Sequence, residues 1–271
     1  MTHATGLKMS AEIAMNQGTD CATFDQGQGR PLVFVHGNVS THAVWKDVVA
    51  PLSDAFRCIS YDLRGHGATP LPDERFELDD LVADLERLRN RLGLERLDLV
   101  AHSLGGIIVT AYARHYPARV RSLSLLATPA FRTEQAMEGA AALVEKVRRN
   151  GLASTLGGMA STWYREEFSL KHPDAHVRRL DEIMMLDEQT VIKSMELTAA
   201  SEIGPWLESL DLPVLILTGE FAVGCDAGTA RLMHERVAGS KLVVLEGLKN
   251  GILTEIPHVV AEKLREFLSG T

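Results

Sequence analysis

The sequence has few cysteines and no closely spaced pair of them. Cys21, Cys58 and Cys225 are its three cysteines in 271 residues. An odd number of cysteines at such wide spacing favours neither a disulfide framework nor a zinc site. We therefore expect a reducing compartment, the cytoplasm, and no bound metal.

The sequence also lacks a long apolar run. Because no stretch of about 18 apolar residues is present, it predicts no transmembrane helix. The first residues, Met1 to Ser10, contain no apolar segment of the kind that secretory signals carry. We expect a protein that has no membrane partner.

Basic residues are fewer than acidic ones. The chain has 28 Lys and Arg against 36 Asp and Glu, which gives a formal net charge of −8. Nucleic acids and anionic membrane surfaces usually require a basic face, so neither is an expected partner. The apolar content of 45% and the charged content of 24% are typical of a globular protein. The length allows one large α/β domain or two small domains.

Short apolar runs alternate with helix-like segments along most of the chain. The apolar runs are residues 31–35, 56–63, 97–102, 120–127, 213–218 and 241–245. The segments with apolar residues at helical spacing are 79–92, 104–114, 228–237 and 257–268. We also expect two strands of a leading hairpin within residues 10–25. This alternation predicts an α/β protein with a mostly parallel central sheet of about eight strands and helices on both faces.

Residues 130–210 interrupt the alternation. Their pattern is largely helical and contains no convincing strand. We expect a core made of residues 1–129 and 211–271, with 130–210 as a helical cap inserted after the sixth strand. Methionines and tryptophans in the cap favour a small core of its own. The same side chains can line a substrate pocket, because methionine packs adaptably.

Ser103 stands between an apolar run and a glycine pair. The segment Ala101-His102-Ser103-Leu104-Gly105 fits the pattern small-x-Ser-x-Gly at the point where a strand ends and a helix begins. This is the pattern of a nucleophile elbow, a tight turn that holds the serine hydroxyl at the carboxyl end of a sheet. The sequence therefore predicts Ser103 as a nucleophile.

Several motifs in order make the chain resemble the α/β-hydrolase superfamily over nearly its whole length. His36-Gly37-Asn38 resembles the loop after that family's third strand, and 62–67 (Asp-Leu-Arg-Gly-His-Gly) resembles its D-x-R-G-x-G turn. Residues 213–220 resemble its seventh strand, and 130–210 lies where the family inserts a lid. The resemblance implies activity on a small carbonyl compound, as in esterases and lactonases.

The resemblance also implies roles for individual residues. The backbone N–H groups of Asn38 and Leu104 would form an oxyanion hole, which stabilises the negative charge that develops on a carbonyl oxygen during attack. The residues expected to contact substrate are His36, Gly37, His102 and Trp163.

The remaining catalytic positions of the family fall on residues that lack the required chemistry. The catalytic histidine position falls on Asn250, with Glu255-Ile256-Pro257 fixing the register, and the acid position falls on Ala222. Glu220 and Asp226 are near the acid position but out of register. An amide cannot accept a proton at neutral pH, and a methyl group cannot orient an imidazole. We therefore predict a degenerate triad.

No other histidine is a strong candidate for the missing base. His258 lies too close to the end of the last helix. His102 is next to Ser103 in sequence, but it need not reach the hydroxyl. His172 or His176 could turn inward from the cap. His36 and His66 belong to the motifs described above.

Three functions therefore stay open. The first is a hydrolase of small esters or lactones with a non-standard base or slow turnover. The second is a non-hydrolytic enzyme of the same fold, such as a lyase, decarboxylase or cyclase, in which Ser103 and Asn250 donate hydrogen bonds. The third is a ligand-binding protein without catalysis. We expect a small-molecule ligand and no cofactor, because no glycine-rich dinucleotide loop follows the first strand, and we leave a homodimer open.

Overall fold

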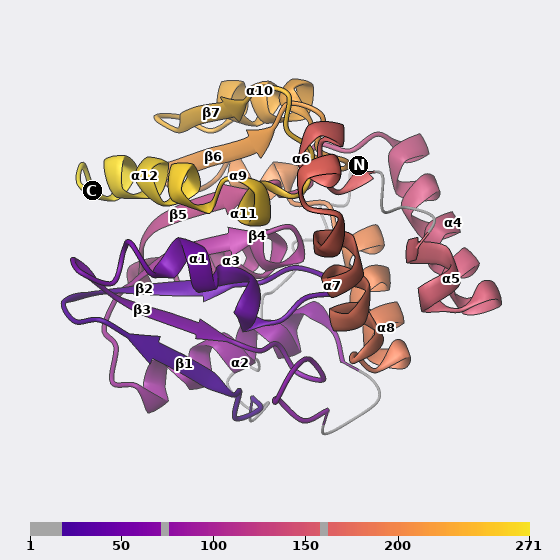
Figure 1. Ribbon diagram of the computed structural model, residues 1–271. Helices are drawn as coiled ribbons and strands as arrows, with labels where there is room; N and C mark the ends of the chain where they lie inside the picture. Colours follow the sequence, from indigo (N-terminus) through magenta and orange to yellow (C-terminus); the bar gives the residue numbers. More distant parts are fainter. Residues whose placement is uncertain (1–17, 72–75, 158–161) are drawn as a thin grey trace, which may run out of the picture.

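The computed structural model, which describes residues 18–71, 76–157 and 162–271, contains one central sheet (Figure 1). Its seven strands in the described residues have the order β1-β3-β2-β4-β5-β6-β7. Only β1 is antiparallel to its neighbour, and the other strands are parallel. The strands are β1 (Thr23–Gln26), β2 (Arg30–Val35), β3 (Phe56–Tyr61), β4 (Leu97–His102), β5 (Val120–Leu126), β6 (Val214–Gly219) and β7 (Lys241–Leu245). The predicted mostly parallel sheet is confirmed.

The expected leading hairpin is only partly covered by the described residues. Its second half contains β1, which pairs with β3 through Thr23 and Tyr61 and the positions that follow. The part of the expected hairpin before residue 18 lies outside the described residues.

Helices cover both faces of the sheet because side chains alternate along each strand. In β2, Val33 and Val35 belong to one buried cluster, whereas Leu32 and Phe34 belong to the other. The first cluster includes side chains of α2 (Leu78–Arg91), α3 (Leu104–His115) and α10 (Ala227–Arg236). The second includes side chains of α1 (Lys46–Val49), α11 (Ile252–Glu255) and α12 (Pro257–Leu268). The described residues also include the 3₁₀ turns η2 (His42–Trp45) and η3 (Pro117–Arg119).

The segment between β5 and β6, called the cap below, is helical in its described residues. It contains α4 (Glu134–Asn150), α5 (Leu152–Gly157), α6 (Glu166–Lys171), α7 (Pro173–Met184), α8 (Glu188–Ala200) and α9 (Gly204–Leu207). A separate buried cluster joins α4, α7 and α8 through Val147, Ile183 and Val191. Figure 1 shows the cap helices at the end of the sheet to which the parallel strands point. Among the described strands the cap follows the fifth.

The D-x-R-G-x-G turn is a structural support for the loops at this end of the sheet. The buried Asp62 carboxylate accepts hydrogen bonds from the backbone N–H groups of His42 at 2.7 Å and Ala68 at 3.0 Å. Arg64 forms two hydrogen bonds of 2.7 Å with the buried carboxylate of Asp84 on α2. Each buried charge is therefore paired, as burial requires.

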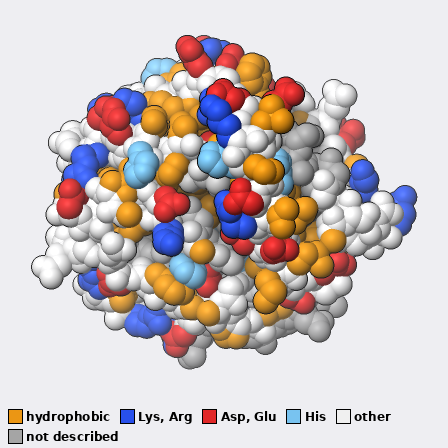
Figure 2. Space-filling model, viewed as in Figure 1, with side chains coloured by type: hydrophobic (Ala, Val, Ile, Leu, Met, Phe, Trp, Pro, Cys, Tyr) orange, Lys and Arg blue, Asp and Glu red, His pale blue; other side chains and the backbone are white. Residues whose placement is uncertain are grey.

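Charges of both signs are spread over the surface. Figure 2 shows acidic and basic side chains interspersed with apolar ones on the face that it displays. Of the helices within the described residues, none combines the length and apolar character needed to cross a membrane.

Candidate active site

Ser103 occupies a strained turn between β4 and α3. Its backbone has φ 53° and ψ −118°, a conformation that costs a non-glycine residue about 1–3 kcal/mol. Hydrogen bonds fix this turn, because the Ser103 N–H donates to the Leu126 carbonyl at 3.0 Å and the Ser103 carbonyl accepts from the Gly106 N–H at 2.9 Å. The serine is thus held at the carboxyl edge of the sheet.

Two glycines allow this turn to approach its neighbours closely. A Cβ on Gly105 would lie 2.2 Å from the Val35 carbonyl oxygen, and a Cβ on Gly37 would lie 2.9 Å from the Ser103 Cβ. No side chain fits in either space. The loop after β2 therefore lies directly against the serine.

A cavity of about 610 Å³ opens above Ser103, between the sheet edge and the cap. Its lining from the core includes Asn38, His102, Ser103, Val223 and Asn250, and its lining from the cap includes Trp163, Tyr164, Arg179, Ile183 and Met195. This volume is in the range that holds small molecules. The structure thus brings together Ser103, Asn38, His102, Trp163 and Asn250, which the sequence motifs had singled out.

The side chain of Asn38 joins the loop after β2 to the cap. Its Nδ2 donates to the Thr198 hydroxyl of α8 at 2.7 Å, and that hydroxyl donates in turn to the Ser194 carbonyl at 3.0 Å. Because the threonine proton is already used, Thr198 must accept, and this fixes the orientation of the Asn38 amide. Asn38 Oδ1 is buried and has no hydrogen-bond partner among the described residues.

Leu104 is the first residue of α3, and its side chain is fully buried. The N–H groups in the first turn of a helix have no partner within that helix. They also carry the positive end of the helix dipole, which favours a negative charge placed next to them. The N–H of Leu104 lies one residue beyond the Ser103 hydroxyl, where such a donor can act.

The amide of Asn250 is held by two hydrogen bonds to the backbone of Val223. Asn250 Oδ1 accepts from the Val223 N–H at 2.9 Å, and Asn250 Nδ2 donates to the Val223 carbonyl at 3.3 Å. Ala222 precedes Val223, and its buried methyl group does not line the cavity. The residues at the expected histidine and acid positions are therefore neighbours, and neither carries an acid or a base.

The two carboxylates near Ala222 are engaged elsewhere. Glu220 Oε2 accepts from the Gly247 N–H at 2.9 Å. Asp226 caps α10 by accepting from the Thr229 N–H at 2.8 Å. Both carboxylates therefore accept hydrogen bonds from the protein's own backbone.

Among the described residues, His102 is the histidine that lines the cavity. Its Nε2 is buried without a hydrogen-bond partner. Burial, and to a smaller extent the positive charge of Arg179, together lower the pKa of His102 to about 4. The ring is neutral at neutral pH, and so low a pKa makes it a weak base.

His36 and Gly37 do not line the cavity, contrary to our expectation that they contact substrate. His36 is fully buried, with Nδ1 donating to the Gly37 carbonyl at 2.9 Å and Nε2 accepting from the Leu63 N–H at 3.0 Å. Burial is the larger cause and the neighbouring His66 the next, and together they lower the pKa of His36 to about 3. The ring supports the loop from below, so the motif position has a structural role.

The other candidate bases do not line the cavity. In the cap, His176 Nε2 is 2.9 Å from the Ser169 hydroxyl, and the ring packs against Trp163 and Tyr164. His172 packs on Phe168 with ring centres 4.6 Å apart. His258 is exposed on α12. None of these three lines the cavity.

Hydrogen bonds tie the cap to the loops that carry the site. The Gly251 N–H donates to the Trp163 carbonyl at 2.7 Å, next to Asn250. Arg165 pairs with the buried Glu255 at 2.8 Å. Arg179 donates to the Val39 carbonyl in the loop after β2. Sequence reasoning missed Arg179 and Thr198, because the cap carries no motif that separates them from its other polar residues.

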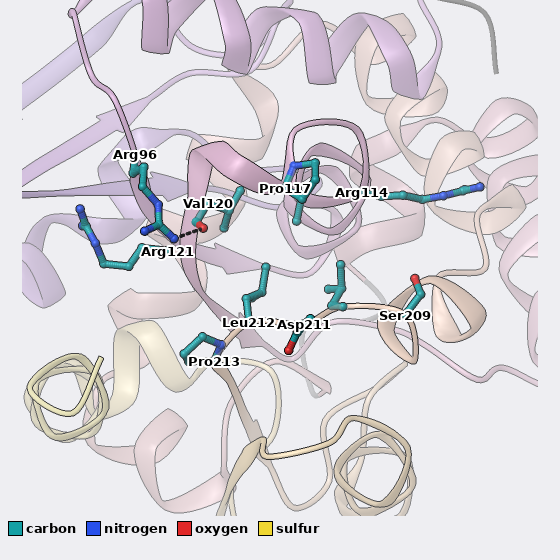
Figure 3. Close-up of a pocket in the computed structure, with 11 residues that line it drawn as sticks. Arg96, Arg114, Pro117, Val120, Arg121, Ser209, Asp211, Leu212 and Pro213 are labelled. Atoms are coloured by element: carbon teal, nitrogen blue, oxygen red, sulfur yellow. Dashed lines mark hydrogen bonds between the residues drawn. The ribbon is translucent and has the colours of Figure 1, made fainter.

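A second cavity, of about 330 Å³, lies at the opposite edge of the sheet, where β5 and β6 begin (Figure 3). Its arginines have structural partners. Arg96 donates to the Val120 carbonyl at 3.0 Å, and Arg121 pairs with the buried Asp98 at 2.7 Å. Arg114 lies over the Trp206 ring. The Ser209 hydroxyl of this cavity donates to the Trp206 carbonyl at 2.7 Å, and the described residues contain no cluster of potential metal ligands.

The fold has counterparts among known proteins. The sequence model of the alpha/beta hydrolase fold family matches residues 30–220. The chain belongs to this family.

Two named proteins and one solved structure are similar to this chain. The chain is 26% identical over 245 residues to "3-oxoadipate enol-lactonase 2" of Acinetobacter baylyi, which covers 90% of this chain and 89% of that protein. It is 35% identical over 131 residues to "Cis-3-alkyl-4-alkyloxetan-2-one decarboxylase" of Shewanella oneidensis, covering 47% and 41%. A thermophilic esterase from Thermogutta terrifontis, solved with malate bound, has a TM-score of 0.84 and 28% identity over 92% of this chain and 93% of that one.

Proposed function

We propose that this protein acts on a small ester or lactone through Ser103 and releases the product slowly. The observation that carries the proposal is the position of Ser103, in a strained turn at the floor of a capped cavity and next to the first turn of α3. The loop at Gly37 and Asn38 lies against the serine and offers a second backbone donor. An oxyanion hole of this kind is the largest single contribution in many acyl-transfer enzymes.

The proposed reaction transfers the acyl group of the substrate to Ser103. Ser103 Oγ bonds to the carbonyl carbon, the bond from that carbon to the alkoxy oxygen breaks, and the serine proton ends on the departing alcohol. In a lactone the alcohol stays attached to the acyl group. Water then cleaves the serine ester and returns the proton to Oγ.

Slow turnover follows from the groups around the serine. The amide of Asn250, bonded on both sides to Val223, cannot accept the serine proton. His102, with a pKa of about 4, is a weak base. Removing the histidine of a serine hydrolase costs on the order of 10⁴- to 10⁶-fold in kcat. The oxyanion hole and substrate binding alone retain about 10³- to 10⁴-fold over the reaction in water.

Similar proteins support this substrate class. The enol-lactonase from Acinetobacter baylyi and the esterase from Thermogutta terrifontis bear names of enzymes that open lactones or cleave esters. Both comparisons extend over about nine tenths of this chain.

The test uses a panel of short p-nitrophenyl esters with two readouts, p-nitrophenol release and intact protein mass. We expect a burst of release and an acyl adduct that decays slowly, and we expect neither with Ser103→Ala. Rapid steady release that needs Ser103 would mean that an unrecognised base completes the site. The proposal fails if the wild-type protein gives neither release nor adduct.

A non-hydrolytic reaction is the second candidate, and the neutral polar groups of the cavity favour it. Ser103, Asn250 and the unpaired Nε2 of His102 offer hydrogen bonds around the cavity but no strong base. The Shewanella oneidensis protein, named as a decarboxylase of oxetan-2-ones, matches about half of this chain. An oxetan-2-one converted to an alkene and carbon dioxide, without a hydroxy acid product, would favour this candidate over hydrolysis.

A further inference from the structure

We propose that Arg179 holds a carboxylate of the substrate, so that the cavity selects an ester or lactone that also carries a free acid group. The inference rests on the proposed function, in which Ser103 attacks the carbonyl of the substrate. It adds that Arg179 binds a second group of the same substrate, a carboxylate. Arg179 lies on α7 of the cap and lines the same cavity as Ser103.

Contacts on several sides place the guanidinium in the cavity wall. One nitrogen donates to the Val39 carbonyl at 2.5 Å, and the guanidinium carbon is 5.9 Å from the centre of the Trp163 ring. The side chain is 22% exposed. The charge acts on the ring of His102, which precedes Ser103 in the chain. Ser103 and Arg179 line one cavity of about 610 Å³, so a single bound molecule can contact both.

The described partners of Arg179 leave its charge available. Its carboxylate partner is Glu182, at 3.3 Å and 63% exposed, so water screens that pair. A guanidinium has five N–H donors in a plane and binds a carboxylate through two parallel hydrogen bonds. Inside the cavity, where water is displaced, such a pair is stronger than at the surface.

Arg178, the preceding residue, provides a matched control. It lies at the cavity rim, 61% exposed, and forms an ion pair with Asp174 one helical turn earlier. Its substitution removes the same charge from the same helix. It leaves the contact of Arg179 with Val39 in place.

The experiment compares two ligands that differ in one charge, monomethyl glutarate and dimethyl glutarate. Their binding to the full-length protein is measured by isothermal titration calorimetry, with Ser103→Ala measured in parallel to exclude heat from turnover.

We expect the monoester to bind at least about tenfold more tightly than the diester, and the preference to decrease as salt is added. Arg179→Gln should weaken the monoester about 10- to 100-fold, the range for a hydrogen bond to a charged group. It should change the diester less than about threefold, and Arg178→Gln should keep the preference.

Other outcomes overturn the proposal. Equal weakening of both ligands by Arg179→Gln would show that Arg179 only braces the loop at Val39. Equal binding of both ligands to the wild-type protein, or no measurable binding of either, would also contradict it. If Arg179→Gln does not fold, as judged by circular dichroism, Arg179→Lys keeps the charge and should retain part of the preference. Because binding needs no turnover, failure of the chemistry at Ser103 is distinguishable from failure at Arg179.

Discussion

At the scale of single residues, the contacts of Asn250 and Ala222 define what the site can do. The amide of Asn250 bonds to the Val223 backbone through both its oxygen and its nitrogen. An imidazole at the same position would be free to face Ser103, provided that a carboxylate held its other nitrogen. The buried methyl group of Ala222 supplies no such partner.

This geometry predicts the effect of restoring the two missing groups. The double variant Asn250→His with Ala222→Asp should raise p-nitrophenyl ester hydrolysis at least about tenfold, because the base alone is worth far more in a complete triad. The single variant Asn250→His should gain less, since nothing orients the ring. Steady-state rates of the three proteins test this. A double variant no faster than the parent would argue against simple loss of a triad and in favour of a repurposed cavity.

The buried histidines predict how stability depends on pH. The pKa of His102 is about 4 in the folded protein and about 6.5 in an unfolded chain. Between these values the unfolded state binds the proton and the folded state does not. Stability is therefore present above pH 6.5 and is lost as the pH falls, by about 1.4 kcal/mol per pH unit for each such group.

The measurement is urea unfolding at several pH values for the wild-type protein and His102→Gln. The glutamine keeps a polar group at this position and cannot titrate. The free energy of unfolding of the variant should fall less steeply between about pH 6.5 and 4.5, while His36 and the carboxylates contribute equally to both proteins. Identical slopes would show that His102 does not remain neutral in the folded state.

At the scale of elements, the packing of α3 against β2 depends on the absence of a side chain at Gly105. A Cβ there would lie 2.2 Å from the Val35 carbonyl oxygen, and backbone cannot move aside as a flexible side chain can. Helix α3 presents its first turn to the cavity, so its distance from β2 also sets the position of Ser103.

The substitution Gly105→Ala should therefore destabilise the protein by about 3 kcal/mol or more. Gly139→Ala is the control, because Gly139 lies in α4 and a Cβ there meets nothing within 4 Å. The control should be stabilising by up to about 1 kcal/mol through helix propensity. Thermal unfolding of both variants tests the pair, and a melting temperature of Gly105→Ala equal to that of the wild-type protein would contradict the packing argument.

At the scale of the whole molecule, the cap and the carboxyl edge of the sheet together form the walls of the cavity and so limit its size. Hydrogen bonds at Gly251, Glu255, Asn38 and Val39 connect the cap to the loops on either side of Ser103. The cavity volume of about 610 Å³ limits the length of an acyl chain that can be held next to the serine.

A series of p-nitrophenyl esters of increasing chain length tests this limit. Acetate and butyrate should give the Ser103 adduct in intact mass, whereas palmitate should not, because its chain exceeds a small-molecule cavity. A palmitoyl adduct formed at a comparable rate would mean that the cap opens enough to expose the serine.

Much of the fold followed from the sequence. Apolar runs predicted the strands β2 to β7, because a parallel sheet covered on both faces makes its strands uniformly apolar. Small residues around Ser103 predicted the tight turn, since close approach excludes side chains. The alternation of strands and helices stopped at residues 130–210, and the described residues of that segment are helical.

The sequence by itself determined which residue stands at each motif position: a serine at 103, an asparagine at 250 and an alanine at 222. Only the tertiary structure decided which side chains face the cavity, because that depends on contacts between segments far apart in the chain. His36 proved to support a loop with both of its ring nitrogens bonded. Arg179, unremarkable among the arginines of the cap, lies beside the active-site loop because α7 packs over the carboxyl edge of the sheet.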